Sequence, residues 1–248
     1  MEKELFNYKI KAIDIKRWDC PYCQKGRLLL NEKEVITIDL AHTLPKGLIG
    51  SHDEYIYLRI LGSLKCDYCD QSIEFISYLE KTTNVYQIGK NDYVEEKNEF
   101  YYPSFFEPAL HPIKLNKYLP EEIRKEIIKS FSLLWVDEKA CANKIRSILE
   151  LIMNQQRIRK GFRTRNGNWK KYNLHQRIVL FANKKKDISE YIMALKHIGN
   201  AGSHGSKLNR DIILEAYEFL EYVLNNLYDK KYEILRKKMI QINKRKKP

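Results

Sequence analysis

Two pairs of cysteines constrain this chain more than any other feature of its sequence. Both have the spacing C-x-x-C, in Cys20-Pro21-Tyr22-Cys23 and in Cys66-Asp67-Tyr68-Cys69. Two residues between thiolates allow one tight turn to present both sulfurs to a metal ion, and two such turns complete a tetrahedral shell. The sequence therefore predicts one structural zinc ion per chain, in a zinc ribbon, with the ligands Cys20, Cys23, Cys66 and Cys69.

Other chemistries for the four cysteines are an iron–sulfur cluster or a redox switch. A thioredoxin-type pair needs one C-x-x-C in a βαβ setting, and catalytic zinc needs an open coordination position that four thiolates do not leave. The two pairs are 42 residues apart, and we expect an enlarged hairpin over residues 34–61 to absorb this length. His42 and His52 lie in that insertion as competing ligands, and Cys141 is expected to be a core thiol.

The charge of the chain is unevenly distributed. Residues 1–100 contain 14 Lys/Arg and 17 Asp/Glu, a net of −3, whereas residues 101–248 contain 31 and 15, a net of +16. This asymmetry predicts two modules and an anionic partner for the second, with nucleic acid as the first candidate. The sequence has no apolar run of transmembrane length and no apolar core of a signal peptide, so we expect a cytoplasmic protein with reduced thiols and no membrane partner.

Periodicity predicts an α+β protein in three parts. Residues 1–100 form a β-rich zinc-ribbon module, with strands expected at 34–39, 55–61 and 72–79. Residues 101–118 are rich in proline and aromatic residues and are expected to be an extended linker. Residues 119–248 form an all-α bundle with a basic tail; helices are expected from 120, over 137–159, over 174–182, up to 198 and from 209, and Gly199 and Gly202 are expected to end the fourth.

A basic segment in the second module predicts nucleic-acid binding. Residues 157–186 contain eleven basic side chains and no acidic one, with Phe162, Trp169 and Tyr172 among them. Cations neutralise phosphates and planar rings stack on unpaired bases, which favours RNA or single-stranded DNA. A solvated loop with its rings in the core is the alternative. The expected binding residues are Arg157, Arg159, Lys160, Arg163, Arg165, Trp169, Lys170 and Lys171.

A Gly-Asn…His element follows, in the stretch LKHIGNAGSHG of residues 195–205. Asn200 and His204 are four residues apart, so one helical turn would place them on the same face. A histidine beside an amide and a cation can act as general base on a ribose hydroxyl. Such a histidine can equally brace the fold by bonding to a neighbouring backbone.

The second module resembles a known family. The resemblance covers about residues 100–230 and rests on Leu119-Pro120, on Arg146 with Glu150, and on Lys196-His197-Ile198-Gly199-Asn200 with His204. This pattern is similar to a bacterial family of unknown function that accompanies restriction and phage-defence proteins and is assigned to the HEPN-like superfamily of helical bundles. Such proteins also carry N-terminal zinc-binding segments.

This resemblance implies a dimerising HEPN-like bundle in a defence or restriction–modification system, with defence proteins as further partners. Active HEPN ribonucleases have Arg before the His, where this chain has Lys196. Three functions remain open: a nucleic-acid-binding protein, a metal-independent endoribonuclease, and a protein-interaction adaptor. The catalytic candidates are His204, Asn200, Lys196, Arg146 and Glu150.

Overall fold

The fold was taken from a computed structural model, which describes residues 2–39, 54–89, 92–203 and 208–245. The chain is α+β, with 47% of the described residues in helices and 26% in strands. It divides into two compact units, each of which gathers segments that are distant in sequence. Unit 1 contains residues 1–112, 128–138 and 209–214, and unit 2 contains residues 113–127, 139–208 and 215–248.

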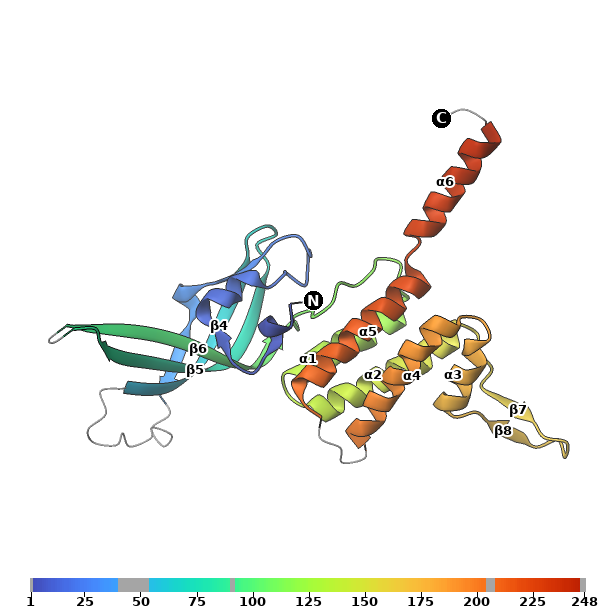
Figure 1. Cartoon of the computed structure of the whole chain (residues 1–248), viewed down its shortest axis with the longest axis horizontal. Helices are drawn as coiled ribbons and strands as arrows, with labels where there is room; N and C mark the ends of the chain where they lie inside the picture. Colours follow the sequence, from blue (N-terminus) through green and yellow to red (C-terminus); the bar gives the residue numbers. More distant parts are fainter. Residues whose placement is uncertain (1, 40–53, 90–91, 204–207, 246–248) are drawn as a thin grey trace. The chain divides into compact units, whose positions relative to one another are not determined.

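Unit 1 is built on an antiparallel sheet, of which Figure 1 labels β4, β5 and β6. The strands are β1 (Ile10–Lys11), β2 (Leu28–Leu30), β3 (Ile36–Asp39), β4 (Glu54–Cys66), β5 (Ser72–Gln87) and β6 (Tyr93–Glu107). Their order is β1-β6-β5-β4-β2, and β3 also pairs with β4. The 3-10 helix η1 (Lys3–Phe6) precedes β1, and η2 (Ala12–Arg17) and η3 (Glu32–Glu34) join the short strands. The predicted 34–61 hairpin is present as the β3–β4 pair, and its connection, with His42 and His52, lies outside the described residues.

One face of this sheet forms the core of unit 1. Side chains alternate between faces along a strand, so Ile73, Phe75, Ser77 and Leu79 of β5 are all buried. An aromatic cluster covers them: the Trp18 ring lies edge-on to Phe106 at 5.3 Å, and Phe106 lies 4.9 Å from Trp135. The last of these rings comes from residues 128–138, far from the strands in sequence.

The sequence placed residues 101–107 in an extended linker, whereas they form the second half of β6. Proline lacks an amide donor and is confined in sheets to edges and bulges. Pro103 lies opposite Ser77, where the β5–β6 register shifts. The irregular register accommodates the proline, so the strand continues to Glu107 instead of ending near residue 100.

Unit 2 is mainly helical, but it is not the all-α bundle that the sequence predicted, because two short strands pair within it. The helices of the chain are α1 (Glu121–Leu134), α2 (Glu138–Gln155), α3 (Leu174–Ala182), α4 (Lys186–Ser203), α5 (Arg210–Tyr228) and α6 (Lys231–Arg245). Between α2 and α3 lies a two-stranded hairpin of β7 (Gly161–Arg163) and β8 (Trp169–Lys171). Asn173 caps α3 through a reciprocal capping box with Gln176. The predicted helix over 174–182 is therefore confirmed at both ends.

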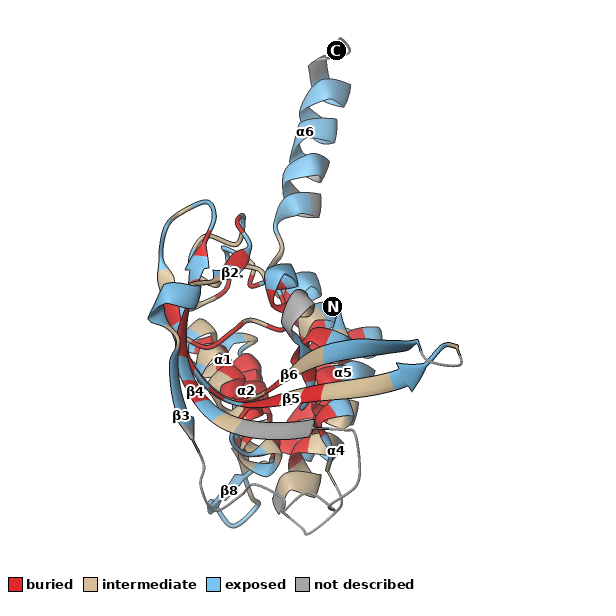
Figure 2. Ribbon diagram, turned by 90° about the vertical axis from the view of Figure 1, so that its left-hand side faces the viewer, coloured by how far each residue is buried: buried red, intermediate tan, exposed pale blue. Residues whose placement is uncertain are grey.

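Amphipathic stripes fix how the helices pack. The predicted stripe of α2 is buried throughout, at Ile145, Ile148, Leu149, Ile152 and Met153. The Cys141 thiol lies 3.1 Å from the Tyr217 hydroxyl of α5, both fully buried, so this cysteine is a core residue. Figure 2 shows α6 as exposed along most of its length, where the sequence indicated only a charged tail.

The sequence predicted that Gly199 and Gly202 end the fourth helix, and this prediction is wrong. Both lie inside α4, which continues to Ser203. A methyl group at Gly199 would lie 2.6 Å from Cβ of Arg146, and one at Gly202 would lie 2.8 Å from the Lys139 carbonyl oxygen. The two glycines thus allow α4 to approach α2 closely. Close packing outweighs the intrinsic cost of glycine inside a helix.

Candidate metal centre and nucleic-acid interface

The first C-x-x-C pair lies in a tight turn before β2. The Gln24 amide donates to the Cys20 carbonyl at 2.9 Å, and the Cys20 amide donates to the Gly26 carbonyl at 3.0 Å. Gln24 has φ of +53°, which lets the chain reverse directly after Cys23. The Gly26 amide then donates to Sγ of Cys23 at 3.4 Å. Such amide donors are the partners that a thiolate needs.

The second pair lies between β4 and β5 and repeats this geometry. The Asp70 amide donates to the Cys66 carbonyl at 3.2 Å, and Asp70 has φ of +58° at the position equivalent to Gln24. The amides of Tyr68 and Cys69 lie 3.4 and 3.5 Å from Sγ of Cys66. Two turns of the same form therefore face each other.

Residues outside the four cysteines hold the two turns together. The Arg27 amide donates to the Asp67 carboxylate at 2.8 Å, and the Asp67 amide donates to the Arg27 carbonyl at 3.0 Å. A methyl group at Gly26 would lie 2.5 Å from Sγ of Cys66. These roles of Gly26 and Asp67 were not predicted. The sequence indicated them only by the position of Gly26 just after the first C-x-x-C pair and of Asp67 inside the second.

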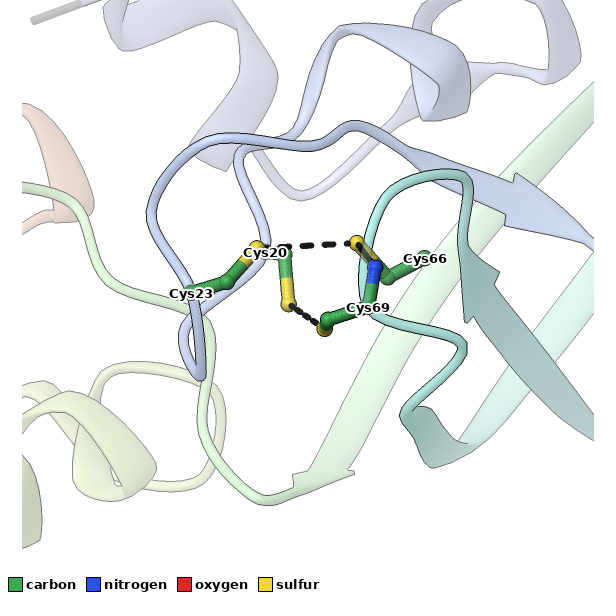
Figure 3. A group of neighbouring side chains, drawn as sticks. All are labelled: Cys20, Cys23, Cys66 and Cys69. Atoms are coloured by element: carbon green, nitrogen blue, oxygen red, sulfur yellow. Dashed lines mark hydrogen bonds between the residues drawn. The ribbon is translucent and has the colours of Figure 1, made fainter.

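The four sulfurs converge on one point, as Figure 3 shows. Sγ of Cys20 lies 3.8 Å from Sγ of Cys69, Sγ of Cys23 lies 3.7 Å from Sγ of Cys66, and all four atoms lie within 4.8 Å of one another. A zinc–sulfur distance of about 2.3 Å gives sulfur–sulfur edges of about 3.8 Å in a regular tetrahedron. The cluster can therefore hold a metal ion such as zinc.

The thiols of this cluster differ in acidity. Backbone amides of Gly26 and Lys25 lower the pKa of Cys23 to about 6. Burial raises the pKa of Cys20 to about 12. Because metals bind thiolates, the amide donors around Cys23 favour the form that binds a metal, whereas burial of Cys20 opposes it until a metal is bound.

The β7–β8 hairpin carries the basic segment of unit 2. Gly161 pairs with Lys171 and Arg163 with Trp169, so these four residues share one face of the hairpin. The turn closes through the Gly167 amide, which donates to the Thr164 carbonyl at 2.9 Å, with φ of +79° at the glycine. In Figure 1 the hairpin extends away from the helices of its unit.

Trp169 is the exposed ring of the hairpin. Its side chain is 63% exposed, whereas Phe162 and Tyr172 are half-buried and pack on each other with ring centroids 5.1 Å apart. A methyl group at Gly161 would lie 2.7 Å from the indole carbon Cζ2 of Trp169. The glycine thus leaves room for the indole to lie against the strand, with Arg163 beside it.

The basic residues of this segment differ in exposure. All seven predicted basic residues are exposed: Arg157, Arg159, Lys160, Arg163, Arg165, Lys170 and Lys171. Arg177, counted in the same basic run, is buried and donates to the Asn154 side chain at 2.8 Å and to the Ile158 carbonyl at 3.2 Å. Burial lowers the pKa of Arg177. Through these hydrogen bonds, Arg177 holds the segment between α2 and α3 in place.

The catalytic candidates are brought together in part. Nε of Arg146 donates to the Asn200 side chain at 3.1 Å, and its Nη1 lies 3.7 Å from the Glu150 carboxylate. Lys196 is buried, at 8% exposure. His204 lies outside the described residues. Arg146, Glu150 and Asn200 form one polar cluster that links α2 to α4.

Two different family models match the N-terminal and the C-terminal part of the chain. A family model described as Domain of unknown function (DUF8608) matches residues 9–106, which hold the sheet and the four cysteines. A model described as Domain of unknown function (DUF4145) matches residues 129–245, which hold the hairpin and most of the helices. No curated protein and no solved structure matches the chain. In the part of the chain that is described, no helix has the length and apolar content needed to cross a membrane.

Proposed function

We propose that this chain is a zinc-containing protein that binds single-stranded nucleic acid, RNA in the first place, through its β7–β8 hairpin. The observation that carries this proposal is the hairpin face where Arg163, Trp169 and Lys171 lie together, all exposed. Cations there would neutralise phosphates and the indole would stack on a base. Stacking tolerates any base, so we expect little sequence preference.

The zinc ion in this proposal is structural, and its site is a zinc ribbon. The sulfur–sulfur separations of 3.7 and 3.8 Å fit a tetrahedral zinc shell. Four thiolates fill the coordination sphere, so the ion would brace the ends of β2, β4 and β5 and take no part in a reaction. We also propose, from the sequence motifs, that the ribbon is joined to a HEPN-like bundle in a cytoplasmic defence protein.

Charge reversal tests the nucleic-acid proposal. We expect Arg163→Glu/Arg165→Glu to weaken binding of a labelled single-stranded RNA about tenfold or more, because two phosphate contacts become repulsive. Fluorescence anisotropy at several salt concentrations measures this change. The control is Lys237→Glu/Lys238→Glu, which changes net charge equally but lies in α6. RNA, single-stranded DNA and duplex DNA are compared under the same conditions.

Three results would contradict the proposal. The first is an equal loss in both double variants, and the second is a preference for duplex DNA. The third is the absence of salt-dependent binding by the wild type, which would favour a protein-interaction adaptor.

A second candidate function is endoribonuclease activity. It is favoured by the Arg146–Asn200 hydrogen bond, which places a cation beside the amide four residues before His204. In this candidate His204 takes the proton of an RNA 2′-hydroxyl, whose oxygen bonds to the adjacent phosphorus. The bond from phosphorus to the 5′-oxygen breaks, that oxygen takes a proton from the protonated histidine or from water, and Arg146 stabilises the negative charge on the phosphorane oxygens. RNA cleavage that persists in EDTA and disappears in His204→Ala would support it. Intact RNA after incubation with the wild type would exclude it.

A further inference from the structure

The sheet of unit 1 has a second face, opposite its core, that carries exposed apolar side chains. The strand register brings Ile36, Leu61, Ile76 and Phe105 into one row across β3, β4, β5 and β6. We call these four residues the apolar row. The neighbouring row consists of Ile38, Arg59, Tyr78 and Tyr102.

The middle of this outer face is exposed to solvent in the isolated chain, whereas Ser63 and Glu80 beyond it are buried. The four side chains of the apolar row, with Ile38 and Tyr78, are between 36% and 63% exposed. Scattered apolar residues on a surface need no explanation, but these six are contiguous across four strands. A contiguous patch of this kind marks an interaction surface.

Charged residues flank the apolar row on both sides. Glu74 and Glu107 lie directly opposite each other one row away, although like charges in this position are destabilising. On the other side Arg59 is exposed and contacts Tyr78, with its Nη2 3.0 Å from the hydroxyl oxygen. Among the described residues, none of these three charges has an ion pair. The apolar row therefore lies between the carboxylates of Glu74 and Glu107 on one side and the Arg59 cation on the other.

This order of charges is complementary to itself. Successive rows on one face are about 6.8 Å apart, so on β4 and β5 the acidic row and the Arg59 row lie at equal distances from the apolar row. On β6 the register shift adds one residue between Phe105 and Tyr102. A two-fold axis that runs along the apolar row would place the Arg59 row of one copy over the acidic row of the other. Arg59 would then lie beside Glu74, one strand away. By symmetry the contact between Arg59 and Glu74 forms twice, as an isologous interface requires.

We propose that the outer sheet face of unit 1 is the interface of a homodimer, with the apolar row of one copy packed on that of its partner. Face-to-face sheets pack about 10 Å apart, within reach of these side chains. Nucleic acid does not fit this face, because Glu74 and Glu107 would repel phosphates. The proposal is independent of nucleic-acid binding by the hairpin.

A charge-swap experiment on the full chain tests this interface. Sedimentation over a concentration series gives the dissociation constant of the wild-type dimer. We expect Arg59→Glu to raise this constant by at least about tenfold, because it places like charges together, and Glu74→Arg to do the same. The double variant Arg59→Glu/Glu74→Arg restores the opposite pairing and is expected to restore the dimer. Ile36→Asp, in the apolar row, is expected to yield monomers.

Controls separate loss of the interface from loss of the fold. Lys97→Glu changes a charge near the tip of the β5–β6 hairpin and should leave the dimer intact. Each variant is checked by its thermal melt. The proposal is overturned if the wild type sediments as a monomer throughout, or if its dimer survives Arg59→Glu and Ile36→Asp. Failure of the double variant to re-form the dimer would also overturn it.

Discussion

At the residue scale, Gly26 is the residue on which the approach of the two cysteine turns depends. A Cβ atom there would lie 2.5 Å from both Sγ of Cys66 and Oδ1 of Asp67. We expect Gly26→Ala to lower zinc affinity about 10- to 100-fold, as changes around metal ligands commonly do. Competition with a chromogenic chelator measures it. Gly89→Ala, where the nearest atom is 3.3 Å away, is the matched control, and equal affinities in both variants would refute this role for Gly26.

Two arginines of the same basic segment are predicted to have opposite effects. Arg177→Met removes hydrogen bonds to Asn154 and Ile158 at a buried site, so we expect a loss of about 1–3 kcal/mol in the free energy of unfolding. Arg163→Ala removes an exposed cation and should leave stability unchanged while it weakens RNA binding. Urea denaturation and anisotropy on both variants test this pair. Equal stabilities would show that Arg177 is not structural.

At the element scale, metal removal is expected to act on the ends of β2, β4 and β5. The cysteine turns are joined through Leu28, which pairs with Cys66, and through the Arg27–Asp67 hydrogen bonds. Because structural zinc contributes folding energy directly, chelation should speed amide exchange in residues 18–30 and 64–73. Helices α2 and α4 should stay protected. Mass spectrometry measures the exchange. If α2 and α4 lose as much protection as the cysteine turns, the metal does not have a local role.

Sequence patterns predicted elements with strong local signals and missed those set by distant contacts. The α2 stripe follows from helical spacing, and the predicted bounds of α3 match the structure, which adds the Asn173 capping box as the reason for its first residue. The full length of β6 did not follow, because Pro103 is tolerated only through a register shift with β5. The glycines of α4 were misassigned for a related reason: their role depends on Arg146 and Lys139 of another helix.

The same limit applies to the candidate sites. The C-x-x-C spacing was sufficient to identify the cysteine cluster. Composition alone did not show that Trp169 is exposed while Phe162 and Tyr172 pack together, or that Arg177 is buried. Those distinctions depend on cross-strand register and on packing against α2.

At the scale of the whole molecule, the two units are interleaved along the chain. Unit 1 includes residues 128–138, and Trp135 from this segment packs in its aromatic cluster with Phe106 and Trp18. The sheet therefore depends on residues beyond its own strands. This dependence differs from a simple succession of independent modules.

We expect Trp135→Ala to destabilise unit 1 by about 3–5 kcal/mol, as for other large aromatic residues removed from a core. Amide exchange in β5 and β6 peptides reports this loss. Val136→Ala, at an exposed neighbour, is the matched control. Unchanged protection of β5 and β6 in Trp135→Ala would show that the sheet folds without this segment.

The central claim, that single-stranded nucleic acid stacks on the hairpin, is tested most directly by tryptophan fluorescence. The chain has three tryptophans, of which Trp18 and Trp135 are buried and Trp169 is exposed. Titration with a single-stranded RNA oligonucleotide should quench the emission of the wild type, and quenching should disappear in Trp169→Phe. Equal quenching in both proteins, or RNA binding without quenching in the wild type, would contradict the claim.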